Sequence, residues 1–442
     1  MRSKPGRVGF MASKGWRPVW LLLLLPLISA ALPFKHPGLL NNIEELNFIR
    51  DQIKAGAQPW KAAFDQANRS GSASLSYAAH PYADVNCGSY SNPDNGCSEE
   101  KADVIAAYTH ALLWHFTGQA AHAQKAIEIM NAWSAVIKTH TNSNAPLQSG
   151  WAASVFPRAA EIIRYTYTGW APADVARFTT MLKTAYLPYI QKGSTANGNW
   201  ELAMIEAILN IAIFNDDQAL FDQALTMWRK RVPAYFYLTT DGPSPVMPPG
   251  RNYTQAQLIG YWYNQTTFVD GLAQETCRDF GHTQYGIASA LNVAETALQQ
   301  GVDLYAEQNK RLSAAMEFHA AYIMGKAVPA WLCGGKLNLG KNPTWEIGYN
   351  HFHNRMTLAL PSTLSLINTI RPTGTDHHMA WETLTHAELG SRGLSITALV
   401  QSDRVRPGSP HLVFLKAGQF QVLWPGAKGR FLALDGSAIP TR

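Results

Sequence analysis

The segments ADVIAAYTHALLWHFTG, residues 102–118, and AHAQKAIEIMNAWSAVI, residues 121–137, decide the fold class of this 442-residue chain. In both segments apolar residues recur three and four positions apart, which is the spacing of one face of an α-helix. Gly118 stands between them, and glycine commonly ends a helix. Two amphipathic helices with so short a join pack antiparallel, so this stretch predicts a helical pair.

The same pattern continues through residues 42–370, and no run of alternating strands precedes residue 390. Helical pairs repeated about six times in one domain close into a ring. We therefore predict an all-α fold, an α/α toroid that forms an incomplete barrel of antiparallel helix pairs. A solenoid is the alternative, but no fixed repeat length is present. Further helical segments are predicted at 156–170, 173–187, 199–214, 217–232, 282–301 and 310–325.

Residues 1–31 read as a secretory signal peptide, in which either Met1 or Met11 is the start. The apolar run WLLLLLPLISAALP at 20–33 follows five Lys or Arg side chains and ends in small residues. This order is typical of a signal peptide, and the run is too short to span a bilayer comfortably. We therefore expect a secreted, extracellular protein without a membrane partner.

Removal of residues 1–31 also removes five positive charges, which lowers the formal net charge from +6 to about +1. So small a charge gives little support to a nucleic-acid partner, and none is expected. We expect a monomer. Residues 32–390 are predicted to form the helical domain. Residues 391–442, which contain the strand-like segment LVFLKAGQFQVLW, are predicted to form a short β-like tail of uncertain structure.

Four cysteines remain in an oxidising compartment, where an even count indicates up to two disulfides. Cys87 and Cys97 flank the turn-rich loop GSYSNPDNG, so a bridge between them is expected. Cys277 and Cys333 could form a second bridge or remain buried thiols. Three Asn-X-Ser/Thr motifs fit glycosylation on a eukaryotic secretory route. Their acceptors are Asn68, Asn252 and Asn264.

The densest chemical cluster is ETCRDFGHTQY, residues 275–285, where a helix is expected to begin. If that helix begins near His282, Tyr285 lies in its first turn. The positive helix terminus and Arg278 would then stabilise a phenolate and lower the pKa of Tyr285. On the alternative interpretation, Asp279 only caps the helix and Arg278 pairs with Glu275.

Two further clusters contain polar side chains beside aromatic ones. Asn199 either caps a helix or binds a carboxyl group through its amide, and Trp200 offers a face on which a sugar ring can stack. The run WEIGYNHFHNR at 345–355 and the triplet Asp376–His377–His378 raise the possibility of a metal site. Neither has a recognised ligand spacing, so we expect no metal and no cofactor. No GxSxG motif of a serine hydrolase is present.

Several of these motifs together resemble the alginate-lyase superfamily, in particular its secreted fungal members and polysaccharide lyase families 5 and 38. The resemblance covers residues 80–390. It implies a toroid fold and β-elimination on a 4-linked polyuronate such as alginate or glucuronan, and hence an acidic polysaccharide as the partner. The motifs are GNWELAMIEA at 198–207, the cluster beginning at Glu275 and continuing to Tyr305, WEIGYNHFHNR at 345–355, WETLTH at 381–386, and the segment from Asn86 to Gly118.

The resemblance also implies roles for individual residues. Arg278 and Tyr285 keep the seven-residue separation of the family, in which the tyrosine is base and acid in turn. Asn199 matches the family asparagine, which neutralises the substrate carboxylate together with a histidine. That histidine is replaced by Trp200, which leaves His282, His351, or Asn199 and Arg278 alone, for this task. Weaker matches imply that His351, Arg355 and Tyr349 contact the substrate.

Two other functions fit the sequence less well. A glycoside hydrolase on the same fold would use paired carboxylates such as Glu201 and Asp279, and it would release reducing ends without an unsaturated product. A secreted glycan-binding protein would keep the cleft without the chemistry, in accord with the replacement at Trp200.

Overall fold

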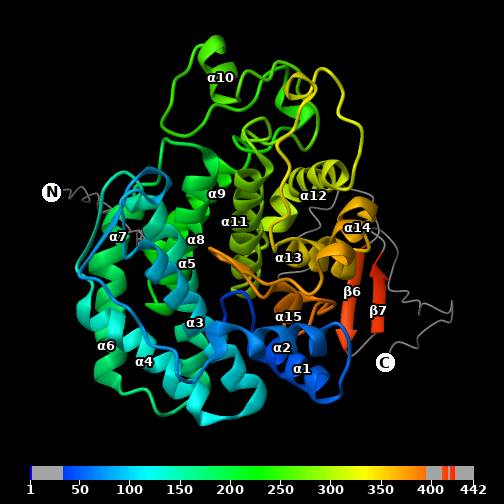
Figure 1. Cartoon of the computed structure of the whole chain (residues 1–442). Coiled ribbons are helices and arrows are strands. Elements are labelled where there is room, and N and C mark those ends of the chain that lie inside the picture. Colours follow the sequence, from blue (N-terminus) through cyan, green and yellow to red (C-terminus); the bar gives the residue numbers. More distant parts are fainter. Residues whose placement is uncertain (2–32, 395–410, 417–418, 424–442) are drawn as a thin grey trace. The chain divides into compact units, whose positions relative to one another are not determined.

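The computed structural model describes residue 1 and residues 33–394, 411–416 and 419–423, and it is predominantly helical (Figure 1). Its helices are α1 (Ile43–Lys54), α2 (Trp60–Arg69), α3 (Cys97–Thr117), α4 (Ala120–Val136), α5 (Ala145–Thr166), α6 (Pro172–Met181), α7 (Leu187–Ile190), α8 (Gly198–Phe214), α9 (Gln218–Arg231), α10 (Gln255–Tyr261), α11 (Phe280–Gln299), α12 (Leu304–Ile323), α13 (Glu346–Tyr349), α14 (Pro361–Ile370) and α15 (Glu382–His386). Two π-helical segments lie at Leu182–Tyr186 and Asn350–Arg355.

The long helices form an inner ring, as the predicted α/α toroid requires. Helix α3 packs against α5, α5 against α8, and α8 against α11 (Figure 1). The ring continues from α11 through α13 and α15 to α1, which returns to α3. Outside it, α4 packs on α3, α9 on α8 and α12 on α11. The all-α toroid prediction is confirmed.

Burial explains why the inner helices are so apolar. Every residue of α8 except Trp200 is buried, because neighbouring helices cover the helix on all sides. Such a helix shows an apolar surface all round rather than one stripe. Trp200, near the first turn, therefore lies at the one place where α8 meets solvent, and this place belongs to the cleft described below.

A buried ion cluster closes the ring where the N-terminal helix meets residues far along the chain. The guanidinium of Arg355 lies 2.8 Å from each carboxylate oxygen of Glu295 and 3.4 Å from Glu45 Oε1. All three side chains are fully buried. Asn42 caps α1 and also donates to Gln299 in α11. Because buried charges require partners, each member of this cluster depends on the other two.

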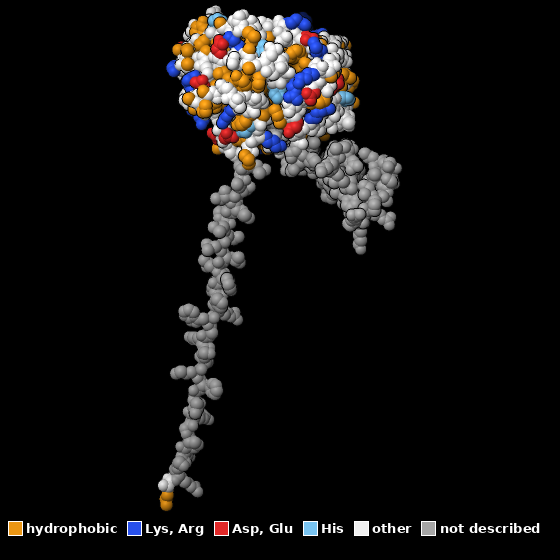
Figure 2. Space-filling view, turned by 90° about the horizontal axis from the view of Figure 1, so that it is seen from below, with side chains coloured by type: hydrophobic (Ala, Val, Ile, Leu, Met, Phe, Trp, Pro, Cys, Tyr) orange, Lys and Arg blue, Asp and Glu red, His pale blue; other side chains and the backbone are white. Residues whose placement is uncertain are grey.

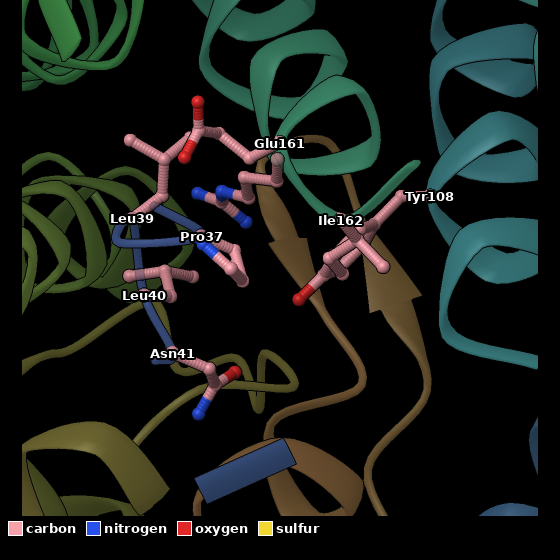
Figure 3. A pocket seen from close by; sticks show the side chains of 8 residues that line it. Pro37, Leu39, Leu40, Asn41, Tyr108, Glu161 and Ile162 are labelled. Carbon is pink, nitrogen blue, oxygen red and sulfur yellow. The ribbon is translucent and has the colours of Figure 1, made fainter. Parts of the chain in front are cut away.

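The segment before α1 lies against the inner helices α3 and α5 (Figure 3). His36 Nδ1 is 2.9 Å from Glu161 Oε2, and Gly38 N–H donates to the same carboxylate. Pro37 and Tyr108 border a small cavity of about 10 Å³. That volume holds about one water molecule, so the cavity is too small for a sugar.

Short strands are confined to the joins between helices. β1 (Asp84–Cys87) pairs with β2 (Asp94–Asn95) and β3 (Thr139–Thr141), and a small hairpin joins β4 (Thr375–Asp376) to β5 (Met379–Ala380). In the tail, β6 (His411–Lys416) and β7 (Gln419–Leu423) pair antiparallel, which confirms the strand prediction there. The signal-peptide prediction for residues 1–31 lies, apart from residue 1, outside the described residues, and the boundary at residue 390 stays a prediction.

Two disulfides staple loops of the domain. The expected bridge Cys87–Cys97 is present, and Cys277 and Cys333 form a second one. The second bridge joins the segment before Arg278 to the loop 332–346. It thereby settles the alternative of bridge or free thiols that the sequence left open.

The surface carries both signs of charge. On the face shown in Figure 2, Lys and Arg side chains alternate with Asp and Glu side chains, without a region of one sign. Among the described residues no helix is both long and apolar enough to cross a membrane. The three glycosylation acceptors have exposed side chains, so their modification stays a prediction compatible with the structure. They are Asn68, Asn252 and Asn264.

The raised pKa of Glu382 predicts that the protein loses stability as the pH rises. Its side chain is buried at the start of α15, where burial, reinforced by Glu346, raises the pKa to about 8. Between the unfolded pKa near 4.5 and about pH 8, the folded state retains a proton that the unfolded state releases, so raising the pH favours unfolding. We expect Glu382→Gln to reduce the loss of unfolding free energy between pH 5 and 9 by roughly 2–4 kcal/mol. Denaturant unfolding across this range measures it, and parallel pH curves for the two proteins would contradict it.

Candidate active site

A cleft of about 370 Å³ opens where the inner helices α3, α5, α8 and α11 meet the loops at their ends. Four Trp or Tyr rings, two cationic side chains and two imidazoles lie along it. The lining residues are Ser89, Tyr90, Ser91, Lys101, Asn144, Leu147, Trp151, Trp200, Arg278, His282, Tyr285 and His377. Four of the residues selected from the sequence, Arg278, His282, Tyr285 and Trp200, are thus brought together.

Tyr285 projects from α11 toward the β4–β5 hairpin. Its hydroxyl donates to Asp376 Oδ2 at 2.9 Å and lies 3.2 Å from His377 Nδ1. Burial and the neighbouring Asp376 carboxylate raise the pKa of Tyr285 well above its usual value. The prediction of a lowered pKa is therefore wrong. The helix begins at Phe280 and not near His282, so Tyr285 lies in the second turn, and its phenol faces an anion.

His377 occupies the turn between β4 and β5, with a φ of +52°. Non-glycine residues rarely adopt this left-handed conformation, and a functional site often contains one. Its Nδ1 contacts Asp376 Oδ1 at 2.5 Å, and its ring packs against Trp151 with a centroid separation of 4.1 Å. In Figure 1 the hairpin, drawn in orange, extends toward α5 and α8. The imidazole is thus held on two sides.

Glu275 collects the donors on the other side of the cleft. This buried carboxylate accepts from Asn199 Nδ2 at 2.6 Å, from Tyr235 Oη at 2.9 Å and from Arg278 Nη1 at 2.9 Å. The Arg278 side chain keeps 24% of its surface exposed, so its remaining N–H groups are accessible from the cleft. Glu275 therefore fixes the guanidinium while leaving donors free for a ligand.

Asn199 lies in the first turn of α8, but its side chain does not line the cleft. It is 1% exposed, its amide nitrogen is used by Glu275, and its Oδ1 has no partner among the described residues. Its neighbour Trp200 lines the cleft instead. The geometry therefore corrects the expectation that the Asn199 amide binds a carboxylate directly, and it shows Asn199 holding Glu275 in place.

His282 forms a second aspartate–histidine pair, on the first turn of α11. Asp279 caps the helix by accepting from the His282 backbone N–H at 2.8 Å, and its other oxygen lies 2.6 Å from His282 Nδ1. Both capping by Asp279 and pairing of Arg278 with Glu275, which the sequence left as the alternative interpretation, are therefore present. These contacts hold Arg278 and His282 in place, and both side chains still line the cleft.

Three residues expected to contact substrate lie elsewhere. His351 is buried, stacked on Tyr305 at 3.7 Å, and burial holds its pKa well below the usual value. Arg355 belongs to the buried ion cluster. Tyr349 borders a separate depression, which shares no residue with the cleft. The geometry corrects these expectations because packing, and not substrate, accounts for the polar run 345–355.

The paired carboxylates of the hydrolase alternative are engaged with other groups. Glu201 pairs with the buried Arg231 and does not line the cleft. Asp279 is committed to His282 and to the α11 terminus. Burial raises the pKa of Asp279, but the contacts with His282 lower it by more. The pKa of Asp279 therefore lies below its usual value. A carboxyl group kept ionised is a poor general acid for hydrolysis.

Sequence reasoning missed Lys101, Trp151 and Tyr90 and gave His377 no role. Lys101 and Trp151 lie on predicted helices, where nothing in the local pattern distinguishes a cleft residue from a surface or core residue. The Asp376–His377 pair was noticed, but only as a weak metal motif. The signal was a polar triplet in the join between α14 and α15, and only the fold reveals its neighbour Tyr285.

The exposed position of Tyr90 at the cleft predicts that its ring contacts the substrate. Its side chain is 95% exposed on the loop bridged by Cys87 and Cys97, at the wall of the cleft. We expect Tyr90→Ala to raise KM on a polymeric substrate about 3–10-fold, since an aromatic contact contributes roughly 0.5–1.5 kcal/mol, and to leave kcat within about twofold. Initial rates against polymer concentration measure this. Leu75→Ala, which removes another exposed side chain, is the control, and equal KM values for both variants would refute the contact.

The ring of helices and the aromatic, cationic cleft define the class first: an α/α-toroid protein with an open groove. The family model described as alginate lyase matches residues 57–245. The resemblance to the alginate-lyase superfamily is thereby confirmed, and the match indicates a polysaccharide lyase. Comparison with curated proteins found no match.

Solved structures share the fold. Alginate lyase A1-III from Sphingomonas species A1 matches with a TM-score of 0.51 at 16% identity, over 77% of this chain and 94% of that one. An alginate lyase from Bacteroides ovatus matches with a TM-score of 0.51 at 14% identity, over 79% and 99%. An A1-III variant complexed with a tetrasaccharide gives 0.52 at 16% identity, over 77% and 93%. At these identities the likeness shows the fold alone.

Proposed function

We propose that this protein is a secreted lyase that cleaves a 4-linked polyuronate, alginate or glucuronan, by β-elimination in the cleft. The observation that carries the proposal is the placement of Arg278 and Tyr285 on one cleft, where His377 lies 3.2 Å from the Tyr285 hydroxyl and His282 also lines the cleft. β-Elimination requires that the substrate carboxylate is neutralised, that the C5 proton is removed and that the leaving O4 is protonated.

Arg278 is suited to neutralising the substrate carboxylate. Its guanidinium is anchored by Glu275 through one nitrogen, and its other donors remain accessible from the cleft. A planar guanidinium binds a carboxylate through two hydrogen bonds, which draws charge away from C5 and makes its proton more acidic. Lys101 adds a second positive charge on the same cleft.

Tyr285 is suited to protonating the leaving O4. Its hydroxyl donates to Asp376, so the phenol carries its proton. A protonated phenol within reach of the glycosidic oxygen can supply the proton that the leaving group needs. Trp151 and Trp200 offer faces on which the flanking sugar rings can stack.

A panel of alginate blocks, glucuronan and other polyuronates tests the proposal. We expect at least one polymer to give the ultraviolet absorbance of an unsaturated uronate without added metal or cofactor. New reducing ends without that absorbance would identify a hydrolase and contradict the proposal. Binding in a pull-down without any product would identify a glycan-binding protein, with the same consequence.

A further inference from the structure

The hairpin turn that carries His377 presents a free imidazole nitrogen to the cleft. Nδ1 is occupied by Asp376, and also faces Tyr285 at 3.2 Å. Nε2 has no hydrogen-bond partner among the described residues and is not a buried atom, and the residue lines the cleft. Trp151, packed on the ring, fixes the direction in which Nε2 points.

The same contacts keep Tyr285 protonated, and a protonated phenol cannot remove a proton from the substrate. Its hydroxyl hydrogen is directed at Asp376, an acceptor that carries negative charge. To act as a base, the phenol would have to lose this proton beside that anion. A neutral imidazole needs no such preparation, because one of its ring nitrogens carries no hydrogen and has an available lone pair.

We propose that His377, oriented by Asp376, is the base that removes the C5 proton, while Tyr285 serves only as the acid that protonates O4. This inference rests on the proposed lyase function and divides its two proton transfers between two side chains. Asp376 is a positioning residue, because it contacts His377 and Tyr285 but does not line the cleft. A carboxylate on Nδ1 fixes the tautomer whose lone pair is on Nε2, and it stabilises the imidazolium that forms.

The step balances within the site. Nε2 takes the C5 proton, and the electron pair of the C5–H bond forms the C4–C5 double bond as the C4–O4 bond breaks. Tyr285 gives its proton to O4 and becomes a phenolate. His377, now protonated on both nitrogens, returns the Nδ1 proton across the 3.2 Å contact to Tyr285. Exchange of the remaining proton with water restores the starting tautomer.

His282 is less suited to this role, although Asp279 orients it in a similar way. Its ring centroid lies 6.0 Å from that of Tyr285, and no hydrogen bond joins the two side chains among the described contacts. It therefore has no direct route by which to return a proton to the phenolate. Its place beside Arg278, through the shared Asp279, assigns it to the carboxylate side of the cleft.

Hydrogen exchange at C5 in deuterium oxide separates the two assignments. In Tyr285→Phe the leaving oxygen receives no proton, so we expect elimination to be lost while C5 still exchanges hydrogen for deuterium above the rate without enzyme. In His377→Gln we expect both elimination and exchange to fall about 10²–10⁴-fold. Asp376→Asn is expected to lower kcat while leaving KM within about threefold. Loss of the C5 proton signal in the recovered polymer reports exchange, and product absorbance reports elimination.

Two outcomes would overturn this inference. One is a Tyr285→Phe protein that has lost C5 exchange as well as elimination, because Tyr285 would then be the base. The other is a His377→Gln protein that eliminates within tenfold of the parent rate. Each variant should unfold at the same temperature as the parent protein. This control shows that a lost activity is not caused by unfolding. Failure of the lyase function itself differs from both, since the parent protein would then give no unsaturated product.

Discussion

Replacing Tyr285 with phenylalanine is expected to lower the rate of unsaturated product formation by about 10²–10⁴-fold, which is the usual contribution of a general acid or base. The change removes one oxygen atom and keeps the ring beside Trp151 and His377. The leaving O4 then has no nearby phenol from which to take a proton. Since the ring still packs, substrate should bind with nearly the same KM, and the loss should lie in kcat.

Tyr322→Phe provides the matched control, because Tyr322 lies on α12 and borders no part of the cleft. Product absorbance at saturating polymer measures both variants. The control should retain the parent rate within about twofold. A Tyr285→Phe protein that retains more than a tenth of the parent rate would remove Tyr285 from the chemistry and would place the active site elsewhere.

The largest effect on stability is expected for Arg355→Met. This change leaves Glu45 and Glu295 buried without the charge that both face. Removal of one partner from a buried ion cluster costs about 3–5 kcal/mol, because an uncompensated charge remains. Methionine keeps most of the volume, so lost packing contributes little. Denaturant unfolding at neutral pH measures the change in the free energy of unfolding.

Arg229→Met is the control for this prediction. Arg229 pairs with Glu307 on the surface, where both side chains are substantially exposed, and such a pair contributes about 0–1 kcal/mol. Adding Glu295→Gln to Arg355→Met should recover part of the loss, since it removes the carboxylate that Arg355 keeps ionised by holding its pKa below the usual value. Equal destabilisation by Arg355→Met and Arg229→Met would show that the buried cluster does not hold the ring closed.

The ring of helices could be predicted because its signal is local. Apolar spacing at 102–118 and 121–137 fixes which faces are covered, and α3 and α4 lie where the pattern placed them. The order of packing also follows from short joins between helices. The closure through α1, α13 and α15 could not be predicted, because α13 and α15 are very short helices and α15 meets α1 from far away in the sequence.

The candidate site was only partly predictable for a related reason. Arg278 and Tyr285 occupy one short segment whose spacing matches a family motif, so their proximity could be inferred. The contact of His377 with Tyr285 spans 92 positions, and periodicity carries no information about such a pair. The run 345–355 misled because a buried ion cluster needs the same residue types as a substrate site. Only burial distinguishes Arg355 from Arg278.

The buried cluster of Glu45, Arg355 and Glu295 also sets the order of events during synthesis. Glu45 leaves the ribosome roughly 300 residues before Arg355, and α1 reaches its partner α15 later still. Contacts between such distant segments form slowly. The nascent chain can pack α1 on α2 and α3, but it cannot complete the buried cluster until Arg355 has been made. A chain truncated before Arg355 leaves Glu45 and Glu295 without their guanidinium partner, even though it contains Arg278 and Tyr285.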